Sequence, residues 1–178
     1  PYTEDSFPRP ISVYGNSKLA GENFVQSICS RHLLVRTCGL YGIAGSSGKG
    51  GNFVETMIRK ARMGEEIRVV SDQIVGPTPT ADLAEQIGIL IETEHYGLFH
   101  ASSEGSCSWF DFATAIFELS SLEPKLEPTI KESYRTPANR PPFSVLENQR
   151  LKKFGINRMR GWREGLADYL KTKHGFGK

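Results

Sequence analysis

Tyr14 and Lys18 are the two residues of this chain whose types and spacing are best suited to acid–base chemistry. On an α-helix, four positions correspond to about 40° of rotation and a rise of about 6 Å, so both side chains can face one site. A phenol ionises near pH 10 in water, and an adjacent cation favours the phenolate. The pair can therefore pass a proton to a carbonyl oxygen while hydride reaches the carbonyl carbon.

The same spacing recurs at Tyr169 and Lys173, so spacing alone does not identify a site. This second pair lies on a polar terminal helix with no strand after it, and we expect it to form a solvated helix face. Tyr14 and Lys18 instead precede the apolar run 32–37, which is typical of a buried strand. From spacing alone, an ordinary helical tyrosine beside a surface lysine remains the alternative interpretation.

Three further polar residues, Asn52, Gln73 and Arg140, carry side chains that suit sugar hydroxyls and diphosphates. Arg140 lies in a proline-rich segment, which pre-positions its guanidinium for a phosphate. Each of the three could equally be a helix cap or a surface hydrogen-bonding group. The four histidines have no metal-ligand spacing, so no metal site is predicted.

Hydrophobic periodicity predicts an alternation of helices and short strands around these residues. Helices are expected over 12–30, 52–63, 80–92, 108–122, 144–154 and 161–173, and strands over 32–37, 67–70 and 98–101. Ser12, Thr80 and Ser108 are candidate N-caps. Strands that alternate with helices of this length predict an α/β architecture.

The same patterns predict which side chains are buried. Ala20, Phe24 and Ile28 are spaced four apart and form one apolar helix face, and the strand at 32–37 reads as buried on both of its faces. Trp109 and Trp162 are expected in the core, and so are the three cysteines, Cys29, Cys38 and Cys107. The glycine-rich segment 42–51 does not fit the phosphate-loop pattern, and we expect a mobile loop at the mouth of a site.

Composition excludes several classes of protein. A formal net charge of +2, an apolar share of 38% and a charged share of 24% do not fit a disordered tail, a coiled coil or a dedicated nucleic-acid binder. No apolar stretch approaches the roughly 20 residues of a membrane span, and the first residues lack a signal-peptide pattern. With an odd number of widely spaced cysteines, a reduced, cytoplasmic protein is predicted.

A series of short motifs follows one order along most of the chain. They are Pro1-Tyr-Thr-Glu-Asp5, Val13-Tyr-Gly-Asn-Ser-Lys-Leu-Ala-Gly-Glu22, Leu34-Val-Arg-Thr37, Gly51-Asn-Phe-Val54, Arg68-Val-Val-Ser-Asp-Gln73, Gly76-Pro-Thr78, Ala81-Asp-Leu-Ala84 and Thr136-Pro-Ala-Asn-Arg-Pro141. In this order they resemble the extended short-chain dehydrogenase/reductase family, and within it the dTDP-4-dehydrorhamnose reductases. The shared order is far more specific than any single motif.

The resemblance implies a fold and a division into two domains. It implies the C-terminal part of an NAD(P)-binding Rossmann-like fold together with a small α/β substrate-binding lobe. Residues 1–44 and 80–105 would form the Rossmann-like part, and residues 45–79 and 106–178 the lobe. The glycine-rich dinucleotide turn and the upstream Ser or Thr of the family's catalytic triad are missing, so the chain as given is expected not to turn over alone.

The resemblance also implies roles for individual residues. Tyr14 would be the catalytic acid, and Lys18 would activate it and hold the nicotinamide ribose. Thr37 and Gly39 would contact the cofactor, NADP or NAD, and Asn52, Gln73 and Arg140 would contact a nucleotide-sugar substrate. A homodimer is possible, and neither a nucleic-acid nor a membrane partner is expected.

Two other functions remain open. An epimerase or dehydratase of the same family would use the same tyrosine and lysine with a tightly held NAD. A non-catalytic regulatory subunit that retains the fold is favoured by Gly39, because the rhamnose-forming enzymes typically have a tryptophan there that packs on the sugar. The expected function is therefore a reductase of a 4-keto nucleotide sugar, with these two alternatives.

Overall fold

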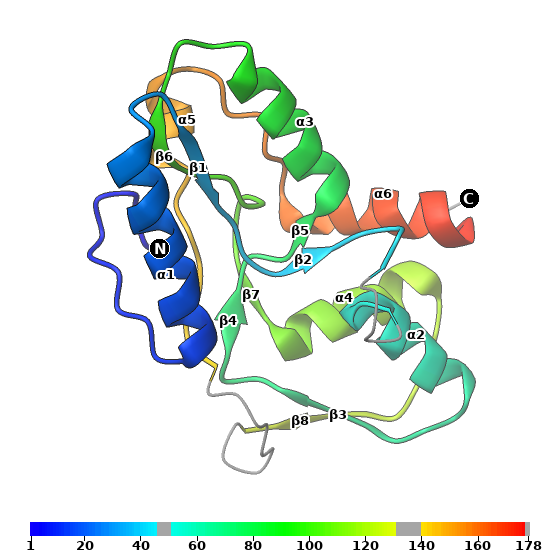
Figure 1. Ribbon diagram of the computed structural model, residues 1–178. Coiled ribbons are helices and arrows are strands. Elements are labelled where there is room, and N and C mark those ends of the chain that lie inside the picture. Colours follow the sequence, from blue (N-terminus) through cyan, green and yellow to red (C-terminus); the bar gives the residue numbers. More distant parts are fainter. Residues whose placement is uncertain (46–50, 131–139, 177–178) are drawn as a thin grey trace.

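The computed structural model describes residues 1–45, 51–130 and 140–176. Helices and short strands alternate along these residues, which confirms the predicted α/β class (Figure 1). The helices are α1 (Val13–Ile28), α2 (Phe53–Arg62), α3 (Thr80–Ile91), α4 (Trp109–Ser120), α5 (Gln149–Lys153) and α6 (Trp162–His174). The strands are β1 (Leu33–Arg36), β2 (Leu40–Tyr41), β3 (Ile67–Val70), β4 (Ile74–Val75), β5 (Thr78–Pro79), β6 (Gly97–His100), β7 (Cys107–Ser108) and β8 (Leu126–Thr129).

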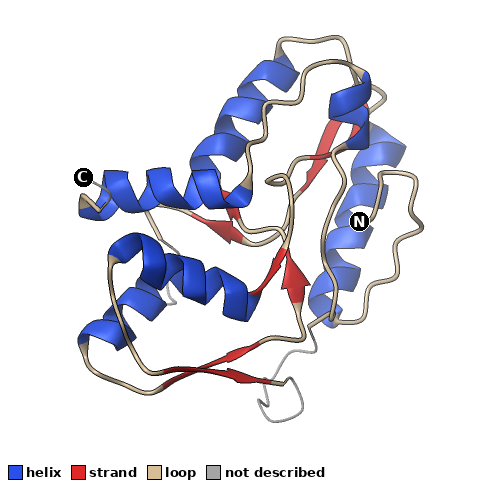
Figure 2. Ribbon diagram, turned by 180° about the vertical axis from the view of Figure 1, so that it is seen from behind, coloured by secondary structure: helices blue, strands red, loops and turns tan. Residues whose placement is uncertain are grey.

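The strands pair two by two, and in Figure 2 the pair of β3 and β8 runs along the lower edge of the molecule, beneath the helices of the larger core. Three pairs are parallel: β1 with β6, β2 with β5, and β3 with β8. The fourth, β4 with β7, is antiparallel. Parallel pairing requires a crossover, and α3 supplies it for β1 and β6 in the manner of an α/β fold.

Two hydrophobic cores hold these elements together. The smaller one lies between the β1–β6 pair, α3 and α5, with Leu90, Phe99, Leu151 and Met159 at its centre. The larger one lies between α2, α4, α6 and β3; its fully buried members include Val54, Ile67, Phe112, Ile116 and Leu166. The smaller core consists mainly of residues from the expected Rossmann-like domain, and the larger core mainly of residues from the expected lobe. Leu151 and Met159 are exceptions, because they belong to the expected lobe but pack in the smaller core. The division into two domains stays a prediction.

Side-chain caps fix where several helices begin. Ser12 caps α1 by accepting the Gly15 N–H (3.1 Å), and Ser108 forms a capping box with Asp111 at the start of α4. Both caps confirm the predicted positions. The prediction that Thr80 caps α3 was wrong. Thr80 is the first helical residue, because Pro79 holds the N-cap position with φ of −65°.

The helix predicted over 144–154 is much shorter, since only Gln149–Lys153 is helical. The residues before it are extended because their backbone groups bond to distant segments. Tyr2 N–H donates to Val145 O (2.9 Å), Glu147 N–H donates to Tyr2 O (2.8 Å), and Ser144 N–H donates to Ile74 O (3.0 Å). These tertiary hydrogen bonds override the local helical pattern.

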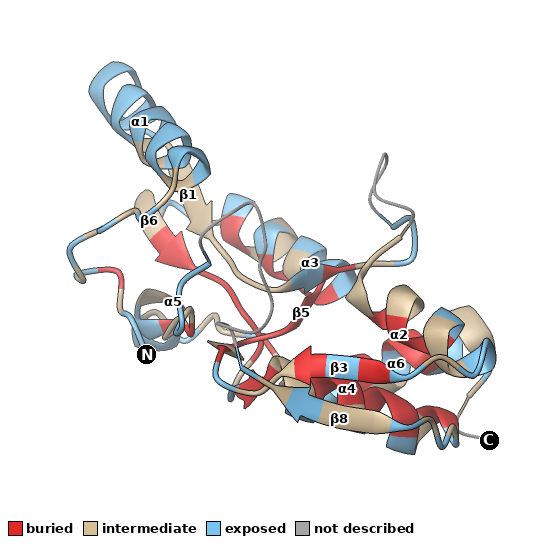
Figure 3. Ribbon diagram, turned by 90° about the horizontal axis from the view of Figure 1, so that it is seen from below, coloured by how far each residue is buried: buried red, intermediate tan, exposed pale blue. Residues whose placement is uncertain are grey.

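The apolar face predicted for α1 is exposed instead of buried. Phe24 and Ile28 are 66% and 82% exposed, and no residue of the helix is buried. Figure 3 shows α1 projecting at one end of the molecule, away from the helices of the larger core. β1 is correspondingly half-buried, not buried on both faces, because among the described residues it pairs on one edge only.

The cysteines were expected to be buried, and only one of them is. Cys107 is buried, Cys38 is half-buried and Cys29 is exposed at the end of α1. Cys29 is the C-cap of α1, and it is exposed because no residue of that helix is buried. None of the described helices has the length and apolarity that a bilayer span requires.

Candidate active site

Tyr14 and Lys18 lie together near the start of α1. Lys18 Nζ is 5.5 Å from the centroid of the Tyr14 ring, within the range of a cation–π contact. Tyr14 is 71% exposed, and among the described residues its hydroxyl has no hydrogen-bond partner. The phenol and the ammonium are therefore both accessible to a ligand.

Thr37 and Gly39 follow the carboxyl end of β1. The Thr37 hydroxyl is buried and has no partner in the described part of the chain. A buried hydroxyl without a partner is costly, so this position favours a bound group that can accept or donate a hydrogen bond.

Gly39 is required by the path of the backbone. Its φ is +61°, and a Cβ placed on it would lie 2.9 Å from Gly76 O and 3.0 Å from Pro77 Cα. Gly39 O also accepts a hydrogen bond from Thr78 N–H (3.1 Å). The segment after β1 is thus packed against residues 75–78, and no side chain fits between them.

This close packing joins the two parts of the predicted site. The Cys38 thiol donates to Gly76 O (3.3 Å), three residues beyond Gln73. Burial raises the pKa of Cys38 and keeps its thiol protonated. The segment that carries the residues expected near the cofactor therefore packs against a segment that begins two residues after Gln73.

Gln73 and Arg140 line one cavity of about 310 Å³. Gln73 comes from the connection between β3 and β4 and is buried; Arg140 is exposed and lies more than sixty positions later. The structure thus brings together two of the three residues expected to bind the substrate. The remaining lining residues come from α2, β3 and the start of α4: Phe53, Thr56, Met57, Lys60, Ile67, Arg68, Val69, Val70 and Trp109.

The cavity combines cations with an aromatic wall. Lys60, Arg68 and Arg140 bring positive charge, while the rings of Phe53 and Trp109 pack with their centroids 4.7 Å apart. Such a lining suits a ligand with an apolar ring and an anionic group. Sequence reasoning assigned Trp109 to the core; it is half-buried, packs against the larger core and also lines this cavity.

Asn52 does not line this cavity. It caps α2, accepting the Glu55 N–H at Oδ1 (3.0 Å) and donating from Nδ2 to Gly42 O and to the Tyr169 hydroxyl (both 3.0 Å). This geometry matches the helix-cap alternative, and its role toward a substrate stays a prediction.

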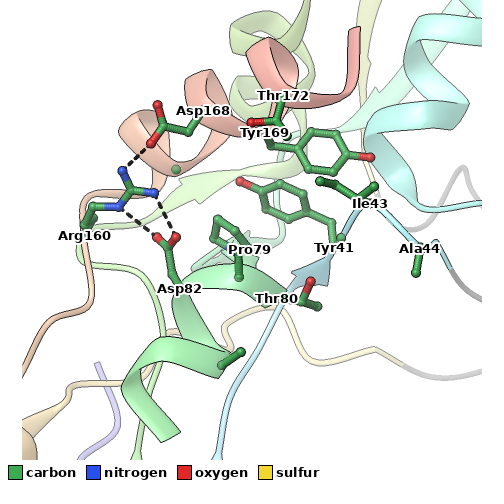
Figure 4. Close-up of a pocket in the computed structure, with 14 residues that line it drawn as sticks. Tyr41, Ile43, Ala44, Pro79, Thr80, Asp82, Arg160, Asp168, Tyr169 and Thr172 are labelled. Atoms are coloured by element: carbon green, nitrogen blue, oxygen red, sulfur yellow. Dashed lines mark hydrogen bonds and ion pairs between the residues drawn. The ribbon is translucent and has the colours of Figure 1, made fainter. Parts of the chain in front are cut away.

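A larger cavity of about 630 Å³ lies between β2, the start of α3 and α6 (Figure 4). Arg160 lies between Asp82 and Asp168 at one side of it: its Nη2 is 2.8 Å from Asp82 Oδ1, and its Nη1 pairs with Asp168. Asp82 is in the first turn of α3, where a carboxylate interacts favourably with the helix dipole. Arg160, Asp82 and Asp168 therefore form ion pairs with one another, and these ion pairs connect α3 to α6.

Tyr169 also lines this larger cavity, and it is 6% exposed. The prediction of a solvated face for Tyr169 and Lys173 was therefore wrong for the tyrosine. Its hydroxyl donates to Glu55 Oε1 (2.7 Å), and its ring packs on Tyr41. Burial opposes the ionisation of Glu55, but hydrogen bonds from Tyr169 and His174 lower its pKa. Tyr169 is thus a structural residue, whereas Tyr14 is accessible.

Comparison with known proteins places this geometry in a family. The family model described as the RmlD substrate binding domain matches residues 1–174. The chain is 42% identical over 173 residues to the spore coat polysaccharide biosynthesis protein SpsK of Bacillus subtilis, and the match covers 97% of this chain and 59% of SpsK. The chain thus spans about 59% of the length of that relative.

Two solved structures have the same fold. A dTDP-4-dehydrorhamnose reductase from Clostridium acetobutylicum aligns with a TM-score of 0.89 at 41% identity, over 97% of this chain and 59% of its own. The Bacillus anthracis dTDP-4-dehydrorhamnose reductase, solved in complex with NADP, aligns with a TM-score of 0.89 at 42% identity, over 96% and 59%. The resemblance inferred from the motifs is confirmed, and the chain belongs to the family of the RmlD substrate binding domain.

Proposed function

We propose that the protein formed by this chain reduces the 4-keto group of a nucleotide-activated deoxysugar, with NADP or NAD as cofactor. The observation that carries the proposal is the accessible Tyr14 hydroxyl with Lys18 Nζ 5.5 Å from its ring. The names of the similar reductases and the NADP bound to one of them support the same reaction.

Tyr14 is the proton donor in this proposal. Reduced cofactor supplies the hydride to the keto carbon. The Tyr14 hydroxyl gives its proton to the keto oxygen, and the ammonium of Lys18 stabilises the phenolate that remains. The exposed helix face leaves room for both the sugar and the nicotinamide ribose beside this pair.

The carboxyl end of β1 fits a cofactor. The buried Thr37 hydroxyl has no partner in the described chain and would be satisfied by a ligand group. Gly39 lets the backbone that follows Thr37 pack closely on Gly76 and Pro77, which sets the path of the chain beside the proposed cofactor site. Lys18 would hold the ribose hydroxyls by hydrogen bonds.

The cavity around Gln73 and Arg140 is the proposed site of the activated nucleotide. Its cations suit a diphosphate, and Phe53 and Trp109 offer a ring surface to a base. Gln73 is buried and lines the cavity, and its amide is proposed to bond to sugar or base groups. Asn52 is proposed as a more distant contact, because its amide is already engaged in capping α2.

Turnover by the full-length protein tests this proposal. With NADPH and a dTDP-4-keto-6-deoxy sugar, a reductase releases one oxidised cofactor per product formed. An epimerase or dehydratase would convert its substrate without net release of oxidised cofactor. A regulatory subunit would do neither, and either of those results would contradict the proposed reduction.

The substrate cavity has its own test in Arg140→Gln. Loss of a guanidinium that binds a diphosphate in both ground state and transition state should raise KM by about 10- to 100-fold with little change in kcat. Arg163→Gln is the matched control, since Arg163 pairs with Glu118 on the surface between α6 and α4. An unchanged KM for Arg140→Gln would remove this cavity from the substrate site.

A further inference from the structure

One ion pair connects the helix that carries Tyr14 and Lys18 to the sheet. Arg36, the last residue of β1, bonds to Glu22 of α1 through Nε to Oε1 (2.8 Å) and through Nη2 to Oε2 (2.5 Å). Both side chains are largely buried, at 23% and 18% exposed. Bidentate arginine–carboxylate pairs of this kind are strong and geometrically specific.

α1 has few other attachments. It buries no residue, and in the described part of the chain the Glu22–Arg36 pair is its only side-chain hydrogen bond or ion pair to another element. Among the described residues, hydrophobic packing therefore does little to set the position of α1 on the sheet. In this part of the protein the ion pair is the side-chain contact that joins the helix to the end of β1, where Thr37 and Gly39 follow.

The pair also controls charge beside Lys18. Glu22 lies four positions after Lys18, so on a helix the two side chains are neighbours that attract one another. In the structure the Glu22 carboxylate bonds to Arg36 and makes no ion pair with Lys18. Without Arg36, that carboxylate would neutralise the cation that favours the phenolate of Tyr14.

We propose that Arg36 is a positioning residue for the catalytic pair: it fixes α1 on β1 and holds the Glu22 carboxylate away from Lys18. The inference rests on the function proposed above, in which Tyr14 and Lys18 carry the chemistry. Arg36 itself touches neither substrate nor cofactor in this proposal. It sets the position of Tyr14 and Lys18 and the electrostatic environment of Lys18.

Two further titratable groups near Arg36 are His100 and Glu4. His100 is the register partner of Arg36, so its side chain projects from the same face, and its backbone N–H donates to Glu4 Oε1 (3.0 Å). Burial lowers the pKa of His100, so the imidazole is neutral at the alkaline pH where a phenol titrates. This leaves Lys18, Glu22 and Arg36 as the charges on which the proposal rests.

The experiment is an NMR titration of the full-length protein with tyrosine labelled with ¹³C at Cζ, whose chemical shift reports phenol ionisation. Tyr14→Phe identifies the Tyr14 signal among those of the other tyrosines. Arg36→Gln should move the Tyr14 midpoint up by about 0.3–0.5 pH unit, because it frees a negative charge near Lys18. Glu22→Gln should move the midpoint down, because it leaves Arg36 positive and unneutralised.

A purely mechanical role would not produce shifts of opposite sign. The double variant Glu22→Gln/Arg36→Gln should restore the wild-type midpoint, while hydrogen exchange of the α1 amides stays faster than in the wild type. Arg36→Lys keeps the charge but not the bidentate bond, so it should keep the midpoint with faster exchange.

Two results would overturn the proposal: single variants whose midpoints stay at the wild-type value or move the same way, or α1 amides that exchange no faster in Arg36→Gln. These readouts need no cofactor and no turnover. The proposal about Arg36 can therefore fail while the proposed reduction stands, and the reduction can fail on turnover while the Arg36 result stands.

Discussion

Gly39 shows how strongly a single position can be constrained beside a candidate site. The family resemblance marked it because related enzymes have a tryptophan there. In this chain its positive φ, and the 2.9 Å that would separate an added Cβ from Gly76 O, leave no space for a side chain. The glycine is therefore a requirement of the backbone here, and it does not by itself favour a non-catalytic protein.

Gly39→Ala should lower the free energy of unfolding by about 2 kcal/mol or more, because a left-handed backbone and a steric clash are both imposed on the new residue. Urea unfolding measures the change. Gly88→Ala is the matched control: Gly88 lies within α3 with nothing within 4 Å of an added Cβ, so alanine there should stabilise by about 0.5–1 kcal/mol. Equal effects of the two changes would contradict this account of Gly39.

Sequence reasoning at the residue scale succeeded where chemistry and order along the chain agreed. It selected Tyr14 and Lys18, which the structure places in contact, and it selected Gln73 and Arg140, which share a cavity. It could not find Arg36 or Glu22, because an ion pair between a helix and a strand depends on their relative placement. It misjudged Tyr169 because the polar residues of α6 obscure a buried face that also includes Leu166 and Leu170.

At the scale of elements, the helix starts at Ser12 and Ser108 were predicted correctly. A cap depends on residues three positions apart, so the sequence contains all of the information. The capping box at the start of α4 is complete: Ser108 Oγ accepts the Asp111 N–H, and Asp111 Oδ2 accepts the Ser108 N–H (both 3.0 Å).

Ser108→Ala should destabilise the protein by about 1 kcal/mol, the typical cost of a lost N-cap. α4 packs at the centre of the larger core, so the loss should appear in global unfolding measured by circular dichroism in urea. Ser27→Ala is the control: the Ser27 hydroxyl bonds to Phe24 O on the exposed helix α1 and caps nothing. If the two variants unfolded alike, the capping box would not contribute as described.

Elements whose shape depends on tertiary contacts were predicted poorly. The short strands β4 and β5 were not predicted, since two residues carry no periodicity. α5 was predicted too long because residues 144–147 bond to the N-terminal segment and to β4. The exposed face of α1 has a genuine apolar pattern, but a pattern does not state which partner covers it.

At the scale of the whole molecule, the two cores are joined at Glu104. Its backbone pairs with residues 160–162 at the start of α6, and its carboxylate accepts hydrogen bonds from Asn148 (3.0 Å), Lys152 (2.9 Å) and Asn157 (2.8 Å). Sequence reasoning had no means of finding this connection, because its parts lie more than forty positions apart.

The same residue makes stability depend on pH. Burial opposes the ionisation of Glu104, but hydrogen bonds from Lys152, Asn157 and Asn148 lower its pKa below the ordinary value of 4.5. A lowered folded-state pKa contributes stability above the unfolded value, and that contribution is lost as the pH falls through the folded value. The pH range over which protonation of Glu104 reduces the stability of the fold therefore lies below about pH 4.5.

Glu104→Gln should destabilise the protein at pH 7 by on the order of 1 kcal/mol, a figure reduced by partial solvent screening. The difference from wild type should shrink as the pH falls below about 4.5, as measured by urea unfolding across pH. Glu118→Gln serves as the control, because the Glu118–Arg163 pair is exposed on the surface. A difference that stays constant down to about pH 2.5 would rule out the linkage.

The most direct test of the account compares the two Tyr–Lys pairs of one chain. In the full-length protein, Tyr14→Phe removes the proposed proton donor and should lower kcat for 4-keto reduction by about 10²- to 10⁴-fold. Tyr169→Phe removes a buried hydroxyl that bonds to Glu55, so it should lower stability and leave kcat within about twofold of wild type. A Tyr14→Phe protein that retained wild-type kcat would contradict the central claim.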